Sequence, residues 1–214
     1  KQIGLVGVTS ILASLSSIIL LPILTQTLTA QEYGAWNQFI VTITLIPAIA
    51  SFGLPYTMVR FLAATRNKDE VREAFYSIGF VVLLGSLGVS LLFLVFAKPI
   101  AVTLFNGDVN ISLILSASLL LNGLILLLFD YFRTFQLIKI YSFFTMVQAY
   151  LTVVLVAFFI AVNYGLIGAI FGVIICQIII FLSMFGIILS RIGFRVPKLY
   201  NMKDYLNFGL PTIP

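Results

Sequence analysis

Three charged side chains lie next to the long apolar stretches of this sequence, and two of them could bind an anion. Arg60 lies about 21 residues beyond Phe39, roughly 32 Å along a helix, and Arg133 lies at a similar distance from Ile111, so both are at a membrane boundary. A guanidinium suits phosphate because its planar fork donates two parallel hydrogen bonds. Asp130 precedes Arg133 by three residues, so the two can also pair on one helix face. Two interpretations stay open: an arginine cluster at the mouth of a cavity, or a local anchoring pair.

Uncharged polar residues occur inside the apolar stretches, where polar groups are costly. Ser14 and Ser17 belong to a stripe at helical spacing near the N-terminus, and Asn122 and Gln177 fall near the middle of two later stretches. Such groups can line a water-filled cavity that binds a polar substrate. They can equally well let helices pack closely or hydrogen-bond between helices. We take these four as candidate substrate-binding residues and keep the packing alternative open.

A candidate hinge lies in the second apolar stretch, at Pro47, Gly53 and Pro55. Proline removes a backbone hydrogen bond and kinks a helix, and glycine loosens the same turn. Broken helices can mark the hinges or binding sites of transporters, although they are also ordinary in membrane helices.

The residues that most enzymes use are scarce. The chain has no histidine and a single cysteine, Cys176. We find no metal-ligand spacing, no glycine-rich phosphate loop and no triad chemistry. We therefore assign no catalytic residue and expect neither an enzyme nor a metal or other cofactor.

The elements that position these residues are predicted to be membrane-spanning helices. The 214 residues are 61% hydrophobic and 9% charged, far below the roughly 25% charged residues of a soluble domain. A helix needs about 20 apolar residues to cross the bilayer. Uncharged stretches of that size predict six helices, over residues 5–28, 36–59, 76–96, 111–132, 141–162 and 164–189, and a seventh that begins near residue 205. The expected fold is an all-α six-helix transmembrane bundle over residues 1–203, followed by the start of a seventh helix over 204–214.

The basic residues alternate with this topology. All the Lys and Arg residues except Lys98 fall in loops on one side of the predicted bundle. By the positive-inside rule that side is cytoplasmic, which predicts a cytoplasmic N-terminus in a multi-pass protein of the cell membrane. The net charge of +5 is thus a topology signal, and no nucleic-acid partner is expected.

Several stretches resemble polysaccharide flippases of the multidrug/oligosaccharidyl-lipid/polysaccharide exporter superfamily. They are LPILTQTLTAQEYGAW (residues 21–36), GLPYTMVRFLA (53–63), FRTFQ (132–136), GLIGAIFG (165–172) and DYLNFGLPTIP (204–214). In that family a helix ending in Pro-x-x-Thr runs into an acidic-Tyr-Gly-aromatic turn, as in the first stretch. Gln26 departs from the pattern, because many relatives carry a basic residue there; this weakens any role of the first helix as a phosphate ligand.

The resemblance covers the whole chain and corresponds to the N-terminal lobe of a two-lobe, 12–14-helix transporter. It implies that the full protein moves an oligosaccharide linked to a polyprenyl (pyro)phosphate across the membrane by alternating access. The implied partners are membrane lipid, the lipid-linked oligosaccharide and a C-terminal helical bundle that this chain lacks. Arg60 and Arg133 would attract the phosphate, while the helix-1 serines, Asn122 and Gln177 would line the sugar path.

Two other functions remain possible on the residues alone. A drug/cation antiporter of the same superfamily would need a buried acid for ion coupling, and Asp130 is the one acid that flanks the membrane. A membrane scaffold that transports nothing would use the polar stripes for helix packing and would leave Ser14 and Asn122 inaccessible to water.

Overall fold

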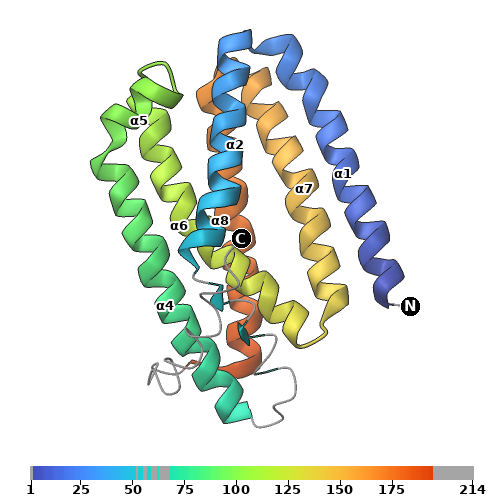
Figure 1. Cartoon of the computed structure of the whole chain (residues 1–214). Helices are drawn as coiled ribbons and strands as arrows, with labels where there is room; N and C mark the ends of the chain where they lie inside the picture. The colour runs from blue at the N-terminus through green and yellow to red at the C-terminus, as the bar shows by residue number, and fades with distance from the viewer. Residues whose placement is uncertain (1, 52, 55–56, 59–61, 63–67, 195–214) are drawn as a thin grey trace.

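The fold is all-helical throughout the part of the chain that the computed structural model describes, which is residues 2–51, 53–54, 57–58, 62 and 68–194. Figure 1 shows the helices as a bundle of nearly parallel rods. Their bounds are α1 Gln2–Thr27, α2 Ala30–Ala50, α4 Lys68–Val95, α5 Ala97–Leu104, α6 Val109–Thr134, α7 Ile138–Ala161 and α8 Gly165–Ile192. All but α5 are long and apolar enough to cross a membrane. The predicted six-helix membrane fold is confirmed, and the predicted seventh helix lies outside the described residues.

Three boundaries differ from the sequence-based prediction by six or more residues. The second helix was expected over residues 36–59, but α2 begins at Ala30 and ends at Ala50. It begins early because Thr29 and Glu32 form a capping box, and the chain turns after Ser51, with Gly53 in the left-handed region at φ 65°. The third helix, expected from residue 76, begins eight residues earlier at Lys68 as α4.

The early start of α4 and the presence of α5 follow from features that hydropathy misses. Asp69 and Glu70 lie in the first turn of α4, where negative charge favours a helix N-terminus, and Val71 is buried one residue later. The region after Lys98 was expected to be loop, yet α5 forms there because Ala97 and Ala101 pack into the bundle.

The two ends of the bundle differ in charge. The first end holds the start of α1, the start of α4, the α6–α7 turn and the end of α8 (Figure 1). We call it the basic end, because it carries Arg72, Arg133, Lys139 and Arg191. The opposite end, which we call the far end, holds the α1–α2 turn, α5 and the α7–α8 turn, with Lys98 in α5. This sorting agrees with the predicted alternation of the loops.

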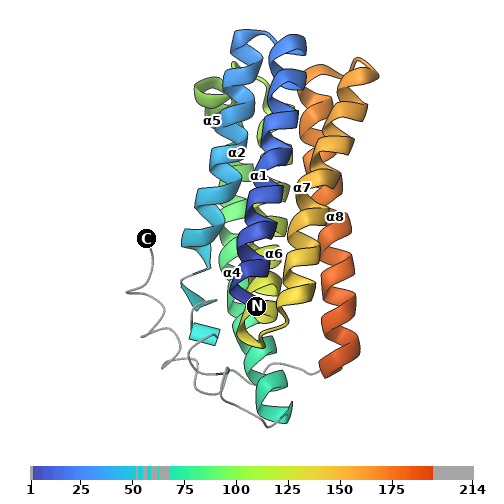
Figure 2. The ribbon, with the colours of Figure 1, turned by 90° about the vertical axis from the view of Figure 1, so that its right-hand side faces the viewer.

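Helices α6 and α8 form the centre of the bundle. They are the two most buried spans, and each packs against the other. Helix α7 covers α8, α4 covers α6, and α1 and α2 are added on the outside (Figures 1 and 2). Gly172 explains the close approach of α7 and α8, because a Cβ there would lie 2.9 Å from the backbone nitrogen of Val156.

Two apolar clusters fill the interior, one in each half of the bundle. The cluster nearer the far end includes Trp36, Phe39, Ile43 and Leu119. The cluster nearer the basic end is larger, with Leu54, Met58, Phe75, Ile125, Phe132, Cys176 and Met184 among its members. On α6 the sequence passes from the first cluster at Leu119 to the second at Ile125, and Asn122 lies between them. Asn122 therefore lies at the boundary between the two clusters.

Candidate functional site

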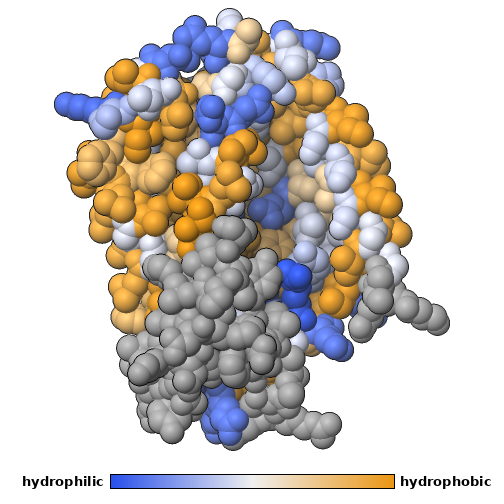
Figure 3. Space-filling view, viewed as in Figure 1, coloured by the Kyte–Doolittle hydropathy of each residue, from blue (hydrophilic) through white to orange (hydrophobic). Residues whose placement is uncertain are grey.

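A groove runs down the bundle because α1 and α2 separate from each other after the turn that joins them. Helix α1 packs along α7, where the Tyr150 hydroxyl donates a hydrogen bond to the Leu12 carbonyl oxygen at 3.0 Å. Helix α2 packs along α6, where the Asn122 side-chain nitrogen donates to the Ile43 carbonyl oxygen. Figure 3 shows hydrophilic atoms in a hollow between α2 and α7, flanked by apolar surface. The α1–α7 pair and the α2–α6 pair are thus the two walls of the groove.

The predicted serine stripe lies on the side of α1 that faces this groove. Leu24 follows Ser17 by about two helical turns and Leu28 follows Ser10 by about five, so these leucines and serines share one side of the helix. Leu24 and Leu28 pack against α2 at the far end, in the cluster that contains Trp36. Closer to the basic end α1 and α2 have separated, and the same side is left open.

The serines themselves are exposed. Ser14 donates from its hydroxyl to the Ser10 carbonyl oxygen at 2.9 Å, and Ser17 is also exposed. A hydroxyl that donates to its own helix still has oxygen lone pairs that can accept a hydrogen bond. Both residues can therefore meet water or a polar solute in the groove.

Asn122 and Gln177, the two predicted mid-depth amides, lie on α6 and α8, the two central helices of the bundle. Asn122 is half-buried on α6 and is held to α2 through its nitrogen. Gln177 on α8 is only 3% exposed, and its Oε1 atom has no hydrogen-bond partner. A buried, unpaired acceptor costs about 1–3 kcal/mol, so a group of this kind needs a reason to persist.

The predicted Asp130–Arg133 pair forms at the basic end. In the last turn of α6, Nη1 of Arg133 donates to Oδ1 of Asp130 at 3.0 Å. The Arg133 side chain is 53% exposed, whereas that of Asp130 is 15% exposed. Because a guanidinium has five N–H donors, Arg133 keeps donors for a further anion. Arg60, the other predicted phosphate ligand, lies outside the described residues.

Two of the three predicted hinge residues, Pro47 and Gly53, fall among the described residues. Helix α2 continues through Pro47, which is buried, and ends three residues later at Ala50. Gly53 adopts a positive φ in the turn that follows, while Pro55 lies outside the described residues. The chain therefore changes direction just after Pro47, which is the local geometry that a hinge requires.

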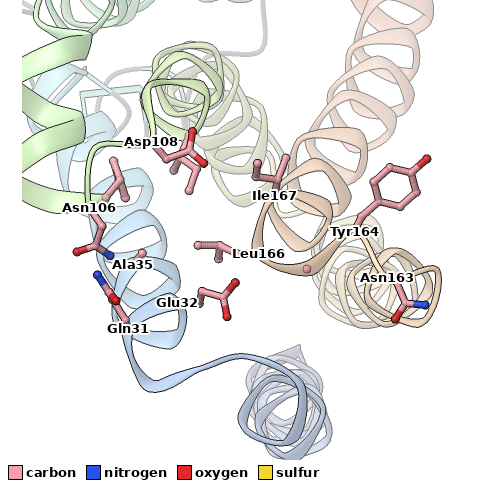
Figure 4. Close-up of a pocket in the computed structure, with 12 residues that line it drawn as sticks. Gln31, Glu32, Ala35, Asn106, Asp108, Asn163, Tyr164, Leu166 and Ile167 are labelled. Atoms are coloured by element: carbon pink, nitrogen blue, oxygen red, sulfur yellow. The ribbon is translucent and has the colours of Figure 1, made fainter.

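A second pocket, which the sequence did not predict, lies at the far end (Figure 4). It has a volume of about 410 Å³ and is lined by the starts of α2, α6 and α8. Two carboxylates face it, but both cap helices: Glu32 accepts from the Thr29 N–H at 2.8 Å, and Asp108 accepts from the Asn110 N–H at 2.9 Å. The motifs Thr-x-x-Glu and Asp-x-Asn are the signals that could have located these caps.

No group of three or more Cys, Asp or Glu residues that could hold a metal ion occurs among the described residues. The candidate residues that the structure describes carry hydroxyls, amides and, at the basic end, one half-exposed guanidinium. These groups form hydrogen bonds and attract anions, so the arrangement is suited to binding a polar, anionic solute.

The chain belongs to the family described as "Polysaccharide biosynthesis protein", which its sequence matches over residues 1–213. This confirms the family that the sequence motifs indicated. No curated protein matches the sequence.

Two solved structures share the fold. One is described as an outward-facing conformation of a multidrug resistance MATE family transporter of the MOP superfamily, at 16% identity and a TM-score of 0.72. It is matched over 95% of this chain and 49% of its own length. The other is a crystal structure of MATE in complex with Br-NRF, at 18% identity and a TM-score of 0.68, matched over 97% of this chain and 50% of its own length. The chain thus spans about half the length of the transporters it resembles, as one lobe of a two-lobed fold would.

Proposed function

We propose that the full-length protein moves a polyprenyl-phosphate-linked oligosaccharide across the cytoplasmic membrane for polysaccharide biosynthesis. The observation that carries the proposal is the groove between the α1–α7 and α2–α6 walls, in a chain that belongs to a polysaccharide biosynthesis family. The solute of such a protein has a sugar headgroup that needs hydrogen bonds and a lipid tail that stays in the bilayer. An open polar groove on an otherwise apolar bundle meets both needs.

In this scheme the basic end faces the cytoplasm, as the charge distribution favours. Arg133 and Arg60 attract the phosphate there, and Asp130 orients Arg133 through their hydrogen bond. Ser14, Ser17 and Gln177 then hydrogen-bond to the sugar along the groove. Asn122 contributes to the same path through its side-chain oxygen only, because its nitrogen is bonded to Ile43.

The second lobe would come from a C-terminal bundle of the same protein. Alternating access requires the groove to open first to one side of the membrane and then to the other, which two lobes achieve by rocking against each other. The turn after Pro47 would let the inner end of α2 follow this movement. One lobe alone would hold half of the path and would transport nothing.

The geometry of Asp130 favours a phosphate substrate over the cation antiporter. Ion coupling needs an acid in the membrane that is free to bind a proton or a metal cation. Asp130 instead lies in the last turn of α6 and is hydrogen-bonded to Arg133. A counterflow assay with a cationic drug under a sodium or proton gradient tests this choice, and drug-driven ion movement would favour the antiporter.

Substitution of Arg133 tests the proposed phosphate site. Arg133→Ala removes the guanidinium and should reduce glycan export by about tenfold, the effect of losing a charge-assisted hydrogen bond of about 1.4 kcal/mol. Arg133→Lys keeps the positive charge but loses the planar fork, so its glycan export should lie between that of the unmodified protein and that of Arg133→Ala. Lys139→Ala is the matched control, because Lys139 is an exposed cation of the same end.

The readout is glycan export in cells that contain equal amounts of each variant. Export that is unchanged in Arg133→Ala removes Arg133 from the site. An equal loss in Lys139→Ala would mean that the general positive charge of this end matters and that Arg133 has no special role.

A further inference from the structure

Pro47 leaves one backbone carbonyl of α2 without its helical partner. In an α-helix the N–H of residue 47 would donate to the carbonyl oxygen of Ile43, but proline has no N–H. Ile43 belongs to the apolar cluster nearer the far end and is 6% exposed. Water cannot easily reach a carbonyl at this depth, so another donor must satisfy it.

Asn122 supplies that donor. Its side-chain nitrogen donates to the carbonyl oxygen of Ile43, across the contact between α6 and α2. This is the same carbonyl that Pro47 deprives of its partner, although the two residues are 75 positions apart in the sequence. We infer that Asn122 is a positioning residue that replaces the hydrogen bond deleted by Pro47 and so fixes α2 to α6 at the groove wall.

The residue after Asn122 explains how α6 comes close enough to make this bond. A Cβ on Gly123 would lie 2.1 Å from Oγ of Ser86 on α4 and 3.9 Å from Cβ of Pro47 on α2. Glycine, which has no Cβ, is therefore the residue that fits where α4, α6 and α2 meet. The Asn122–Gly123 pair combines a small residue for close approach with an amide that reaches the freed carbonyl.

The location of this bond gives it an effect on the groove. Helix α2 ends at Ala50, so the bond at Ile43 is made in the last two turns before the chain turns away at Ser51. A proline kink without a tie can sample a range of bend angles, because the carbonyl of residue i−4 is pushed aside by the ring. Asn122 holds one bend angle and thereby sets the separation of the α2–α6 wall from the α1–α7 wall.

A double-mutant cycle between positions 47 and 122 tests the inference in the full-length protein. Pro47→Ala restores an N–H to α2, so the Ile43 carbonyl recovers its helical partner and no longer needs Asn122. Asn122→Leu removes the donor and keeps a side chain of similar size. The inference predicts that Asn122→Leu strongly lowers stability in the protein that has Pro47 and changes it little in the Pro47→Ala background.

Stability is the first readout, measured as the midpoint of unfolding by sodium dodecyl sulfate. With Pro47 present, Asn122→Leu should raise the unfolding equilibrium constant by about three- to tenfold, the range expected for one interhelical hydrogen bond in a membrane protein. In the Pro47→Ala background the change should be less than about twofold. Equal changes in the two backgrounds, or no change beside Pro47, would overturn the inference.

The width of the groove is the second readout. It is measured between spin labels attached after Leu45→Cys on α2 and Val154→Cys on α7, two positions that are 59% and 62% exposed. All variants also carry Cys176→Ala, which removes the native thiol. Asn122→Leu should broaden the distance distribution, and adding Pro47→Ala should narrow it again. If Asn122→Leu alone does not fold, Pro47→Ala must restore folding; failure to do so counts against the inference.

The inference rests on the proposed function only for its consequence in transport. Glycan export that is lost in Asn122→Leu should return in part in the Pro47→Ala/Asn122→Leu protein, because the second substitution restores the position of α2 but not the Asn122 oxygen in the sugar path. If the stability and distance results agree with the cycle but the parent protein moves no lipid-linked glycan, the proposed function fails and the positioning role stands. If export returns without coupling in stability or distance, the positioning role fails.

Discussion

Gly172→Ala is predicted to separate α7 from α8 and to destabilise the bundle. A Cβ at this position would lie 2.9 Å from the Val156 nitrogen, 3.0 Å from the Leu155 carbonyl carbon and 3.1 Å from the Val156 Cα. All three are backbone atoms, so no side chain can rotate away. Ordinary contacts begin at 3.4 Å, and the helices must therefore move apart by at least about 0.5 Å, the difference between 3.4 and 2.9 Å.

The expected magnitude combines two opposing effects. Alanine is a better helix former than glycine by about 0.5–1 kcal/mol. Overpacking a tight contact costs about 1–3 kcal/mol. Gly186→Ala on the same helix is the matched control, because a Cβ there meets nothing within 4 Å and only the helix-propensity gain applies.

The assay is unfolding in detergent, followed by helical circular dichroism as sodium dodecyl sulfate is added. Gly172→Ala should be less stable than Gly186→Ala by about 1–3 kcal/mol. The hydrogen bond from Thr152 to Cys176 Sγ, 3.3 Å long and one turn further along α8, should weaken in the same variant. Equal stability of the two alanine variants would refute the argument that backbone contact at Gly172 sets the α7–α8 spacing.

Three further predictions follow from single contacts. Gln177→Leu removes the unpaired Oε1 acceptor and should stabilise the bundle by about 1 kcal/mol in the same titration while glycan export falls; a loss of stability would mean that the amide is already satisfied. Tyr76→Phe removes the hydroxyl that donates to the Gly193 carbonyl at 2.8 Å but keeps the ring against Phe194, so hydrogen exchange at the end of α8 should accelerate by about two- to tenfold. Ser17→Cys should introduce a thiol that reacts with a membrane-impermeant maleimide, as expected of a residue in a water-filled groove. Protection of this thiol from the reagent would favour the interpretation as a membrane scaffold.

The membrane spans could be predicted from the sequence because a lipid environment restricts which sequences and structures can cross it. A run of about 20 apolar residues must be helical, so six spans were located before any contact was known. The ends of the helices were harder, because they depend on charge and capping rather than hydropathy. Asp69 and Glu70 extend α4 into a region that looked like a solvated loop, and the Thr29–Glu32 capping box moves the start of α2 to Ala30.

The candidate site was predictable in its residues but not in its contacts. Asn122 and Gln177 were recognised as mid-depth amides, and Asp130 and Arg133 as a pair on one helix face, because depth and spacing follow from the helix repeat. The bond from Asn122 to Ile43 needed the pairing of α6 with α2, which no local pattern specifies. One part of this bond could be predicted: because Pro47 has no N–H, the sequence alone indicates that the Ile43 carbonyl needs a hydrogen-bond donor from outside the helix.

The short α7–α8 turn has a consequence for how the protein is made. The turn at Asn163 and Tyr164 carries no charge. The cations Lys139 on α7 and Arg191 on α8 lie at the ends of these helices that are away from the turn. The two helices also bury their polar groups against each other, through the bond between Thr152 and Cys176. Such a pair can enter the bilayer from the ribosome as one helical hairpin, with its uncharged tip leading and its cations retained behind. Biosynthesis would then complete the α7–α8 unit before α1 settles against α7, so the α1–α7 wall of the groove would form only after α8, although α1 precedes α7 and α8 in the sequence.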